Sequence, residues 1–222
     1  MPTVLNDPRL DSLLTDLHRA SSDQGAAIER YYRHDRTGPW LGMEPRDIAF
    51  MADKLEALDR DKAEFCYMIC RAIGARRIVE AGTSFGVSTL YLAAAVRDNG
   101  GGVVFAAERE AIKVRHARAN YDAAGLAGYI ELHEADVIEA CSGFAGPIDF
   151  VLFDIWADAV RPVLDVLLPR LRAGSVICTD NTASEWNRKN YAALFEILEN
   201  PAHGFRTMTL PFTGGFELSV KL

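Results

Sequence analysis

The sequence has little of what marks a membrane-bound, secreted or nucleic-acid-binding protein. No apolar run approaches the length of a membrane span, and the first residues lack the charged-then-apolar order of a signal peptide. The 222 residues carry a formal net charge of −7, whereas binding to a phosphate backbone requires a basic surface. We therefore expect a cytoplasmic protein that binds neither a membrane nor nucleic acid.

Cysteine is scarce, and its spacing does not suggest a metal or redox centre. The four cysteines are Cys66, Cys70, Cys141 and Cys178, with no Cys-x-x-Cys pair among them. Cys66 and Cys70 lie one helical turn apart on an apolar face, which is typical of core packing. We assign these thiols no chemistry.

Repeats and low-complexity tracts are also absent, and the composition is that of a globular protein. With 49% hydrophobic and 25% charged residues, the chain suits one domain over residues 1–222. Within it we expect a helical cap and lid over residues 1–75 and an α/β core over residues 76–222.

The first part of the chain predicts helices outside the sheet. Residues 8–34 have helical apolar spacing, with a break near Ser21-Ser22-Asp23 where a second helix can be capped. Further helices are predicted at 46–58 and 60–73. The apolar faces of the N-terminal helices suggest a possible homodimer.

A loop with two glycines and two prolines is predicted between these helices, over residues 34–45. It carries Trp40 and Met43, two large apolar side chains. The loop is either a connector or a lid over a bound cofactor, and long loops beside a binding strand often have a function.

From Arg77 onward, strands and helices alternate, which indicates a doubly wound α/β sheet. Strands are expected at 77–81, 103–108, 129–133, 148–154 and 174–180, and helices at 87–98, 110–124, 159–171 and 185–199. Residues 205–210 and 216–220 then predict a closing antiparallel hairpin.

A glycine-containing turn follows the first of these strands and predicts a ligand-binding site. The segment from Glu80 to Ser88 reads Glu-x-Gly-x-x-x-Gly, with Gly82 and Gly86 free to let the backbone approach a ligand. This spacing differs from the Gly-x-Gly-x-x-Gly of dinucleotide binders. Glu108 ends the next strand, where an acidic residue can accept hydrogen bonds from a ribose. The pattern resembles motif I of class I S-adenosylmethionine-dependent methyltransferases; the alternative is a plain strand-to-helix turn.

Two further strands end in oxygen-bearing side chains. Asp154 follows the apolar strand that starts at Ile148, and Asp180-Asn181 follows the next strand. If the two strands are neighbours, about 5 Å apart, these three oxygen donors converge. Two carboxylates and an amide suit Mg²⁺ or another hard divalent cation. The alternative is that the acidic residues only cap the helices that follow.

Residues 153–158 and 168–181 resemble the cation-dependent small-molecule O-methyltransferases, a group that includes catechol and caffeoyl-coenzyme A O-methyltransferases. The similarity extends from about Glu44 to the last residue, and it implies a seven-stranded Rossmann-like sheet, mostly parallel with a C-terminal antiparallel hairpin.

The resemblance also implies roles for individual residues. Asp154, Asp180 and Asn181 would hold the metal, and Asp154 and Trp156 would take part in catalysis. The residues assigned to cofactor binding are Met43, Glu80, Gly82, Ser84, Gly86, Ser88, Glu108, Arg109, Ala135, Asp136, Val137, Asp154 and Trp156.

One position departs from the family pattern. The family places a lysine, its usual general base, three residues after the metal aspartate, and this chain has Ala157 there. Either the metal alone acidifies the acceptor hydroxyl, or another residue serves as the base. His34, Glu185 and Lys189 are weak candidates.

Together these features predict an S-adenosylmethionine-dependent O-methyltransferase that acts on a small hydroxylated molecule with a divalent cation, for which the oxygen donors favour Mg²⁺. The alternatives are a metal-independent methyltransferase and a non-catalytic cofactor-binding protein. A nicotinamide oxidoreductase is disfavoured by the glycine spacing and the closing hairpin.

Overall fold

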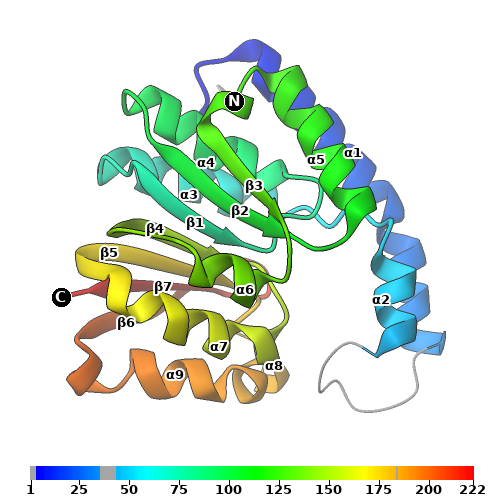
Figure 1. The fold of residues 1–222 in the computed structure, drawn as a ribbon. Helices are drawn as coiled ribbons and strands as arrows, with labels where there is room; N and C mark the ends of the chain where they lie inside the picture. Colours follow the sequence, from blue (N-terminus) through cyan, green and yellow to red (C-terminus); the bar gives the residue numbers. More distant parts are fainter. Residues whose placement is uncertain (1–3, 36–43, 184) are drawn as a thin grey trace.

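The computed structural model describes residues 4–35, 44–183 and 185–222 and contains one seven-stranded sheet (Figure 1). Its order is β3 (Ile130–Glu134), β2 (Val103–Glu108), β1 (Arg77–Ala81), β4 (Ile148–Phe153), β5 (Leu171–Asp180), β7 (Phe216–Lys221) and β6 (Phe205–Leu210). The first five strands in this order pair in parallel, while β7 is antiparallel to both of its neighbours. The predicted Rossmann-like methyltransferase sheet with a C-terminal antiparallel hairpin is therefore confirmed.

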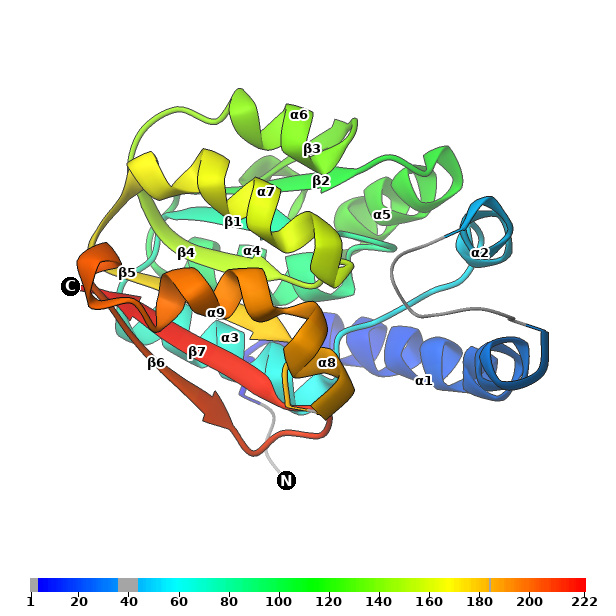
Figure 2. The same ribbon diagram turned by 90° about the horizontal axis from the view of Figure 1, so that it is seen from below.

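Helices cover both faces of the sheet (Figure 2). One face carries α1 (Pro8–Arg30), α3 (Arg60–Ala72), α4 (Val87–Asp98) and α5 (Ala111–Ala124). The other carries α6 (Val137–Ser142), α7 (Ala157–Leu167) and α9 (Ala192–Leu198), with α8 (Glu185–Asn190) before α9. The short α2 (Pro45–Met51) lies beyond the strand ends, apart from both layers.

The central strands are apolar on both sides because each side packs in a core. Every residue of β4 is buried, and alternate residues enter opposite cores: Phe150 packs with α3 and α4, and Val151 packs with α7 and α9. The same alternation places Ile78 and Val79 of β1 on opposite faces. The four cysteines are free and buried, as the sequence predicted.

The predicted break in the first helix is wrong. α1 runs unbroken from Pro8 to Arg30 and continues as a π-helical turn, Tyr31–Asp35. Ser21 donates its hydroxyl to the Leu55 carbonyl at 3.0 Å and accepts from the Ala57 amide at 3.2 Å, so it ties α1 to the segment after α2. Ser22 donates back to the His18 carbonyl at 2.9 Å. Neither hydroxyl is free to cap a new helix.

Other helix boundaries also differ from the prediction. α2 ends at Met51, and residues 54–59 form no helix. α7 ends at Leu167 because Leu168–Arg170 is a 3₁₀ turn around Pro169, and β5 then begins at Leu171. The helix expected over 185–199 is two short helices that part at Tyr191, which is buried. α6 was not predicted, since six residues are too few to show a helical period.

No helix in the part of the chain that the structure describes is both long enough and apolar enough to cross a membrane.

Asp149 of β4 joins three strands at the end of the sheet opposite to the glycine turn. One of its oxygens accepts from the backbone amides of Arg76 and Arg77 at 2.8 and 2.9 Å, and the other accepts from the Arg172 guanidinium. Burial alone would raise the pKa of this carboxyl, but these bonds hold it below its usual value.

We expect Asp149→Ala to lower the free energy of unfolding by about 2–4 kcal/mol, because it leaves two amides and a guanidinium without their shared acceptor. Urea denaturation at pH 7 measures the loss. Asp165→Ala, which removes a half-exposed carboxylate paired with Arg161 one turn away on α7, is the control and should cost less than about 0.5 kcal/mol. Equal losses in the two variants would contradict the role of Asp149.

Candidate functional site

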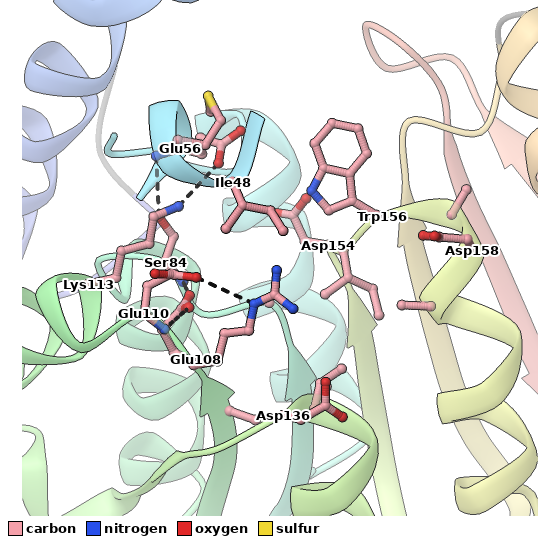
Figure 3. A pocket seen from close by; sticks show the side chains of 18 of the residues that line it. Ile48, Glu56, Ser84, Glu108, Glu110, Lys113, Asp136, Asp154, Trp156 and Asp158 are labelled. Carbon is pink, nitrogen blue, oxygen red and sulfur yellow. Dashed lines mark hydrogen bonds and ion pairs between the residues drawn. The ribbon is translucent and has the colours of Figure 1, made fainter. Parts of the chain in front are cut away.

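A cleft of about 840 Å³ opens at the carboxyl ends of β1, β2 and β4 and is partly covered by α2 (Figure 3). Nine of the residues predicted to bind the cofactor line it: Gly82, Ser84, Glu108, Arg109, Ala135, Asp136, Val137, Asp154 and Trp156. Figure 3 shows Ser84 and Glu108 on one side of the cleft and Asp154 and Trp156 on the other. Open parallel sheets bind their ligands at this edge.

The turn after β1 needs glycine at two positions. Gly82 has φ +97°, and a Cβ on it would lie 2.1 Å from the Asp154 carbonyl oxygen. Gly86 has φ +80° at the start of α4, where a Cβ would lie 2.3 Å from the Tyr121 ring. A side chain at either position would push the turn away from β4 or from α5. The close approach therefore depends on the two glycines that the sequence singled out.

Three of the predicted cofactor residues lie beneath this turn rather than on the cleft wall. Glu80 is completely buried, and its Oε2 accepts from the hydroxyls of Thr83 and Thr89 at 3.1 and 2.5 Å. Gly86 and Ser88 are also buried. The structure gives these residues a role in shaping the turn, and their contact with a cofactor stays a prediction.

Glu108 fixes the turn from the side of β2. Its Oε2 accepts from the Ser84 amide and its Oε1 from the Glu110 amide, both at 2.9 Å. The carboxylate is half-buried and lines the cleft, and each oxygen keeps a further lone pair for a ligand. The side chain thus links the glycine turn to the position expected for a ribose.

Asp136 caps a helix at the edge of the cleft. Its Oδ1 accepts from the amides of Ile138 and Glu139, at 2.9 and 3.4 Å, at the start of α6. It also lines the cleft, so the geometry is compatible with both capping and cofactor binding.

The three predicted metal ligands meet in a second, smaller hollow of about 220 Å³. It is lined by Glu56, Ala57, Leu58, Asp59, Asp154, Asp180 and Asn181. β4 and β5 pair with Phe153 opposite Thr179, which brings the residues that follow each strand together. The turn of the β6–β7 hairpin fixes the position of the end of β5, because the Gly215 carbonyl accepts a hydrogen bond from the Asn181 amide at 3.1 Å.

The electrostatics of the smaller hollow favour a cation. Burial and the carboxylates of Asp180 and Glu56 raise the pKa of Asp154 well above its usual value, and burial likewise raises the pKa of Asp180. No hydrogen bond to the Asp154 carboxylate is present among the described residues. A bound divalent cation would offset both shifts, and the oxygen-only donors fit a hard metal such as Mg²⁺.

Whether these donors can hold a divalent cation depends on the side-chain amide of Asn181. No group of three or more His, Cys, Asp or Glu side chains placed to hold a metal ion occurs among residues 4–35, 44–183 and 185–222. Two carboxylates and the Asn181 side chain therefore make up the candidate set.

A buried lysine that the sequence did not reveal contacts two of the carboxylates that line this hollow. Lys62 of α3 is 1% exposed, and its Nζ lies 2.6 Å from Asp180 Oδ1 and 2.9 Å from Asp59 Oδ2. Burial alone would lower the pKa of Lys62, but the bonds to these carboxylates raise it above the usual value. One signal could have identified it: Lys62 precedes Cys66 by one turn on the apolar face of α3.

A second unpredicted lysine lies in the cleft itself. Lys113 of α5 is 6% exposed, and its Nζ lies 3.3 Å from Glu56 Oε2, on the same side of the cleft as Ser84 (Figure 3). Tyr191 also lines the cleft and donates its hydroxyl to the Ile155 carbonyl at 3.5 Å. Both residues line the cleft, Lys113 beside Glu56 and Tyr191 beside Ile155.

Several predicted residues cannot be placed. Trp40 and Met43, the two side chains of the predicted lid, lie outside the described residues, and the side chains of His34 and Glu185 do as well. Lys189 is exposed on α8 and does not line the cleft. Ala157 begins α7 at the cleft wall and offers no base.

Glu80 leads to a pH-dependent stability. Its burial raises its pKa from 4.5 to about 7 despite the threonine hydroxyls, so the folded protein holds a proton that the unfolded chain releases. Stability should therefore fall as pH rises through this window, by about 2–3 kcal/mol relative to Glu80→Gln, which has no proton to lose. Urea denaturation of both proteins between pH 5 and pH 8 measures the difference.

The control for this prediction is Glu131→Gln on the exposed face of β3. Its stability should follow that of the unmodified protein at every pH. Parallel pH profiles for the unmodified protein and Glu80→Gln would show that the Glu80 carboxyl ionises normally.

Comparison with known proteins agrees with this geometry. Residues 79–182, from β1 to the residue after Asn181, match a family described as a methyltransferase domain. A catechol O-methyltransferase of Mycobacterium tuberculosis is 29% identical over 126 residues, which is 56% of each chain. The match thus spans little more than half of that relative's length.

Solved structures extend the similarity to most of the chain. A cofactor-bound protein from MTB is 25% identical, with a TM-score of 0.66 over 81% of this chain and 90% of that one. An O-methyltransferase from Bacillus cereus in complex with SAH shares the fold at 20% identity, with a TM-score of 0.68 over 93% of this chain and 100% of that one. The match of residues 79–182 to a methyltransferase domain and the similarity to a catechol O-methyltransferase confirm the resemblance to the O-methyltransferases inferred from the sequence.

Proposed function

We propose that this protein is an S-adenosylmethionine-dependent O-methyltransferase that acts on a hydroxyl of a small molecule and uses a divalent cation. The observation that carries the proposal is the position of Asp154. It lines both the large cleft and the small acidic hollow, as do Glu56 and Asn181. A cofactor in the cleft and a cation in the hollow would therefore share one wall.

The cleft supports S-adenosylmethionine as the cofactor. The glycine turn brings the backbone close to the cleft, and Glu108 offers acceptors for ribose hydroxyls. Further acidic side chains line the cleft, which favours a positively charged sulfonium. The volume of about 840 Å³ leaves room for a small acceptor beside the cofactor.

The chemistry asked of the protein is mainly positioning. A sulfonium methyl group is already activated, so the site has to align it with the acceptor oxygen and exclude water. Trp156, which is 37% exposed at the cleft wall, would pack against a flat acceptor and orient it. When bound, the cation would acidify the acceptor hydroxyl, which matters because Ala157 supplies no base.

A metal-independent methyltransferase is the second candidate, and one observation favours it. Lys62 already pairs with Asp180, so part of the negative charge of the hollow is neutralised without a metal. A protein that binds the cofactor without catalysis remains the third reading of the cleft.

We expect Glu108→Ala to weaken S-adenosylmethionine binding by about 1.5–3 kcal/mol, or roughly 10- to 150-fold, because it removes a charged acceptor from the ribose position. Isothermal titration calorimetry measures the affinity. Glu134→Ala, at the end of β3 and exposed, is the matched control and should bind like the unmodified protein. A folded Glu108→Ala protein with unchanged affinity for S-adenosylmethionine would contradict the assignment of Glu108 to the ribose.

Methyl transfer tests the reaction directly. We expect transfer from S-adenosylmethionine to members of a panel of small catechols and phenols in the presence of Mg²⁺, and its loss when a chelator is added, because Ala157 leaves the acidification to the cation. Mass spectrometry of the products measures both. Turnover that persists in the chelator would support the metal-independent candidate, and tight cofactor binding without transfer to any acceptor would support the non-catalytic reading.

A further inference from the structure

The small hollow contains more negative charge than its contacts neutralise. Four carboxylates line it, from Glu56, Asp59, Asp154 and Asp180. Lys113 pairs with Glu56 from the side of the cleft, and among the described residues Lys62 is the cation that contacts Asp59 and Asp180. Neighbouring carboxylates repel one another, so the Lys62 ammonium offsets an unfavourable electrostatic energy in the folded protein.

Burial of Lys62 is not explained by packing alone. The same face of α3 carries Ala63, Cys66 and Cys70, which are buried and apolar, so an unbranched apolar side chain would suit the position. A lysine at 1% exposure is retained there at the cost of removing its ammonium from water. Compared with an apolar side chain, the ammonium adds the two contacts to the carboxylates of Asp59 and Asp180.

The contacts of Asp180 leave little of its carboxylate free for a metal, because they use three of its roughly four lone-pair sites. Its Oδ1 accepts from Lys62 Nζ at 2.6 Å and from the Asn181 amide at 2.8 Å. Its Oδ2 accepts from Asn181 Nδ2 at 3.0 Å. A cation that approaches Oδ2 meets the Asn181 side-chain amide at that oxygen and the Lys62 ammonium on the other oxygen of the same carboxylate.

We propose that Lys62 is a resident cation that competes with a divalent cation for Asp180, so that it stabilises the metal-free protein and weakens metal binding. The inference rests on the cation site of the proposed function. Two positive charges on one carboxylate repel each other, and the repulsion is screened less than on an open surface because the side chains of Lys62 and Asp180 are only 1% and 8% exposed. Removal of the ammonium should therefore strengthen the binding of the metal and weaken the metal-free fold.

The test is Lys62→Met, which keeps an unbranched side chain of similar length without the charge. Calorimetric titration of the metal-free protein with MgCl₂ and with MnCl₂, at pH 8 to keep the carboxylates ionised, should show at least tenfold tighter binding in the variant. Differential scanning calorimetry should show a lower Tm for the metal-free variant and a larger rise in Tm on addition of the cation. Neither readout requires activity.

Lys221→Met is the matched control. Lys221 also donates from a partly buried ammonium, to the His203 carbonyl at 2.8 Å, but it lies at the other end of β7 from the pairing of Phe216 with Asp180. The variant has the same change in net charge, and its affinity for the cation should change less than twofold.

A second pair of variants keeps the proposal testable if Lys62→Met does not fold. Asp59→Asn removes a half-exposed partner of Lys62, which leaves the ammonium to Asp180 alone and should weaken cation binding at least threefold. Asp61→Asn removes a charge two residues further along the chain without a contact to the Lys62 ammonium, and it should have a smaller effect.

Unchanged or weaker cation binding in Lys62→Met, or equal effects of Asp59→Asn and Asp61→Asn, would overturn the role of Lys62. Absence of cation binding in both the unmodified protein and Lys62→Met would overturn it together with the cation part of the proposed function. Titration with S-adenosylmethionine and the methyl-transfer assay report on the remainder of that function independently, so the two failures can be told apart.

Discussion

The contact between the ends of β1 and β4 is the constraint on which the site depends. The Asp154 amide donates to the Ala81 carbonyl at 3.0 Å, and Gly82 then passes so close to the Asp154 carbonyl that no side chain fits. This one contact places the glycine turn, which shapes the large cleft, beside the carboxylate that faces the small hollow. Parallel pairing supplies the alignment, and the missing Cβ supplies the space.

The features that sequence predicted well are those encoded by local pattern. Apolar strands such as β4, the glycine spacing after β1 and the polar residues after β4 and β5 each carry their own signal, and the rule that ligands bind at the carboxyl ends of parallel strands assembled them into one site. The closing hairpin was visible because Gly214 and Gly215 separate two short strands. Strand pairing then brings the ends of these strands together.

The features that the sequence did not reveal depend on contacts between distant segments. From its sequence neighbours Ser21 is predicted to cap a helix, but in the structure its hydroxyl bonds to Leu55 and Ala57, which lie in a different segment. Lys62 reads as a solvated lysine at the start of a helix, because its carboxylate partner lies 118 residues further on. Glu80 was assigned to a ligand on the basis of its motif, while the structure surrounds it with threonine hydroxyls and packed side chains. Local spacing cannot distinguish these cases.

The hairpin turn at Gly214 and Gly215 also has a consequence for how the protein is made. The amides of Asn181 and Ala183 donate to the carbonyls of these two glycines at 3.1 and 2.9 Å, so the loop that bears Asp180 is supported by residues more than thirty positions later. A chain emerging from the ribosome can form the glycine turn and β4 well before those residues appear. The walls of the large cleft that β1, β2 and β4 supply can thus take shape during synthesis, whereas Asn181, which lines both the cleft and the hollow, is held in place only when the final hairpin docks against β5.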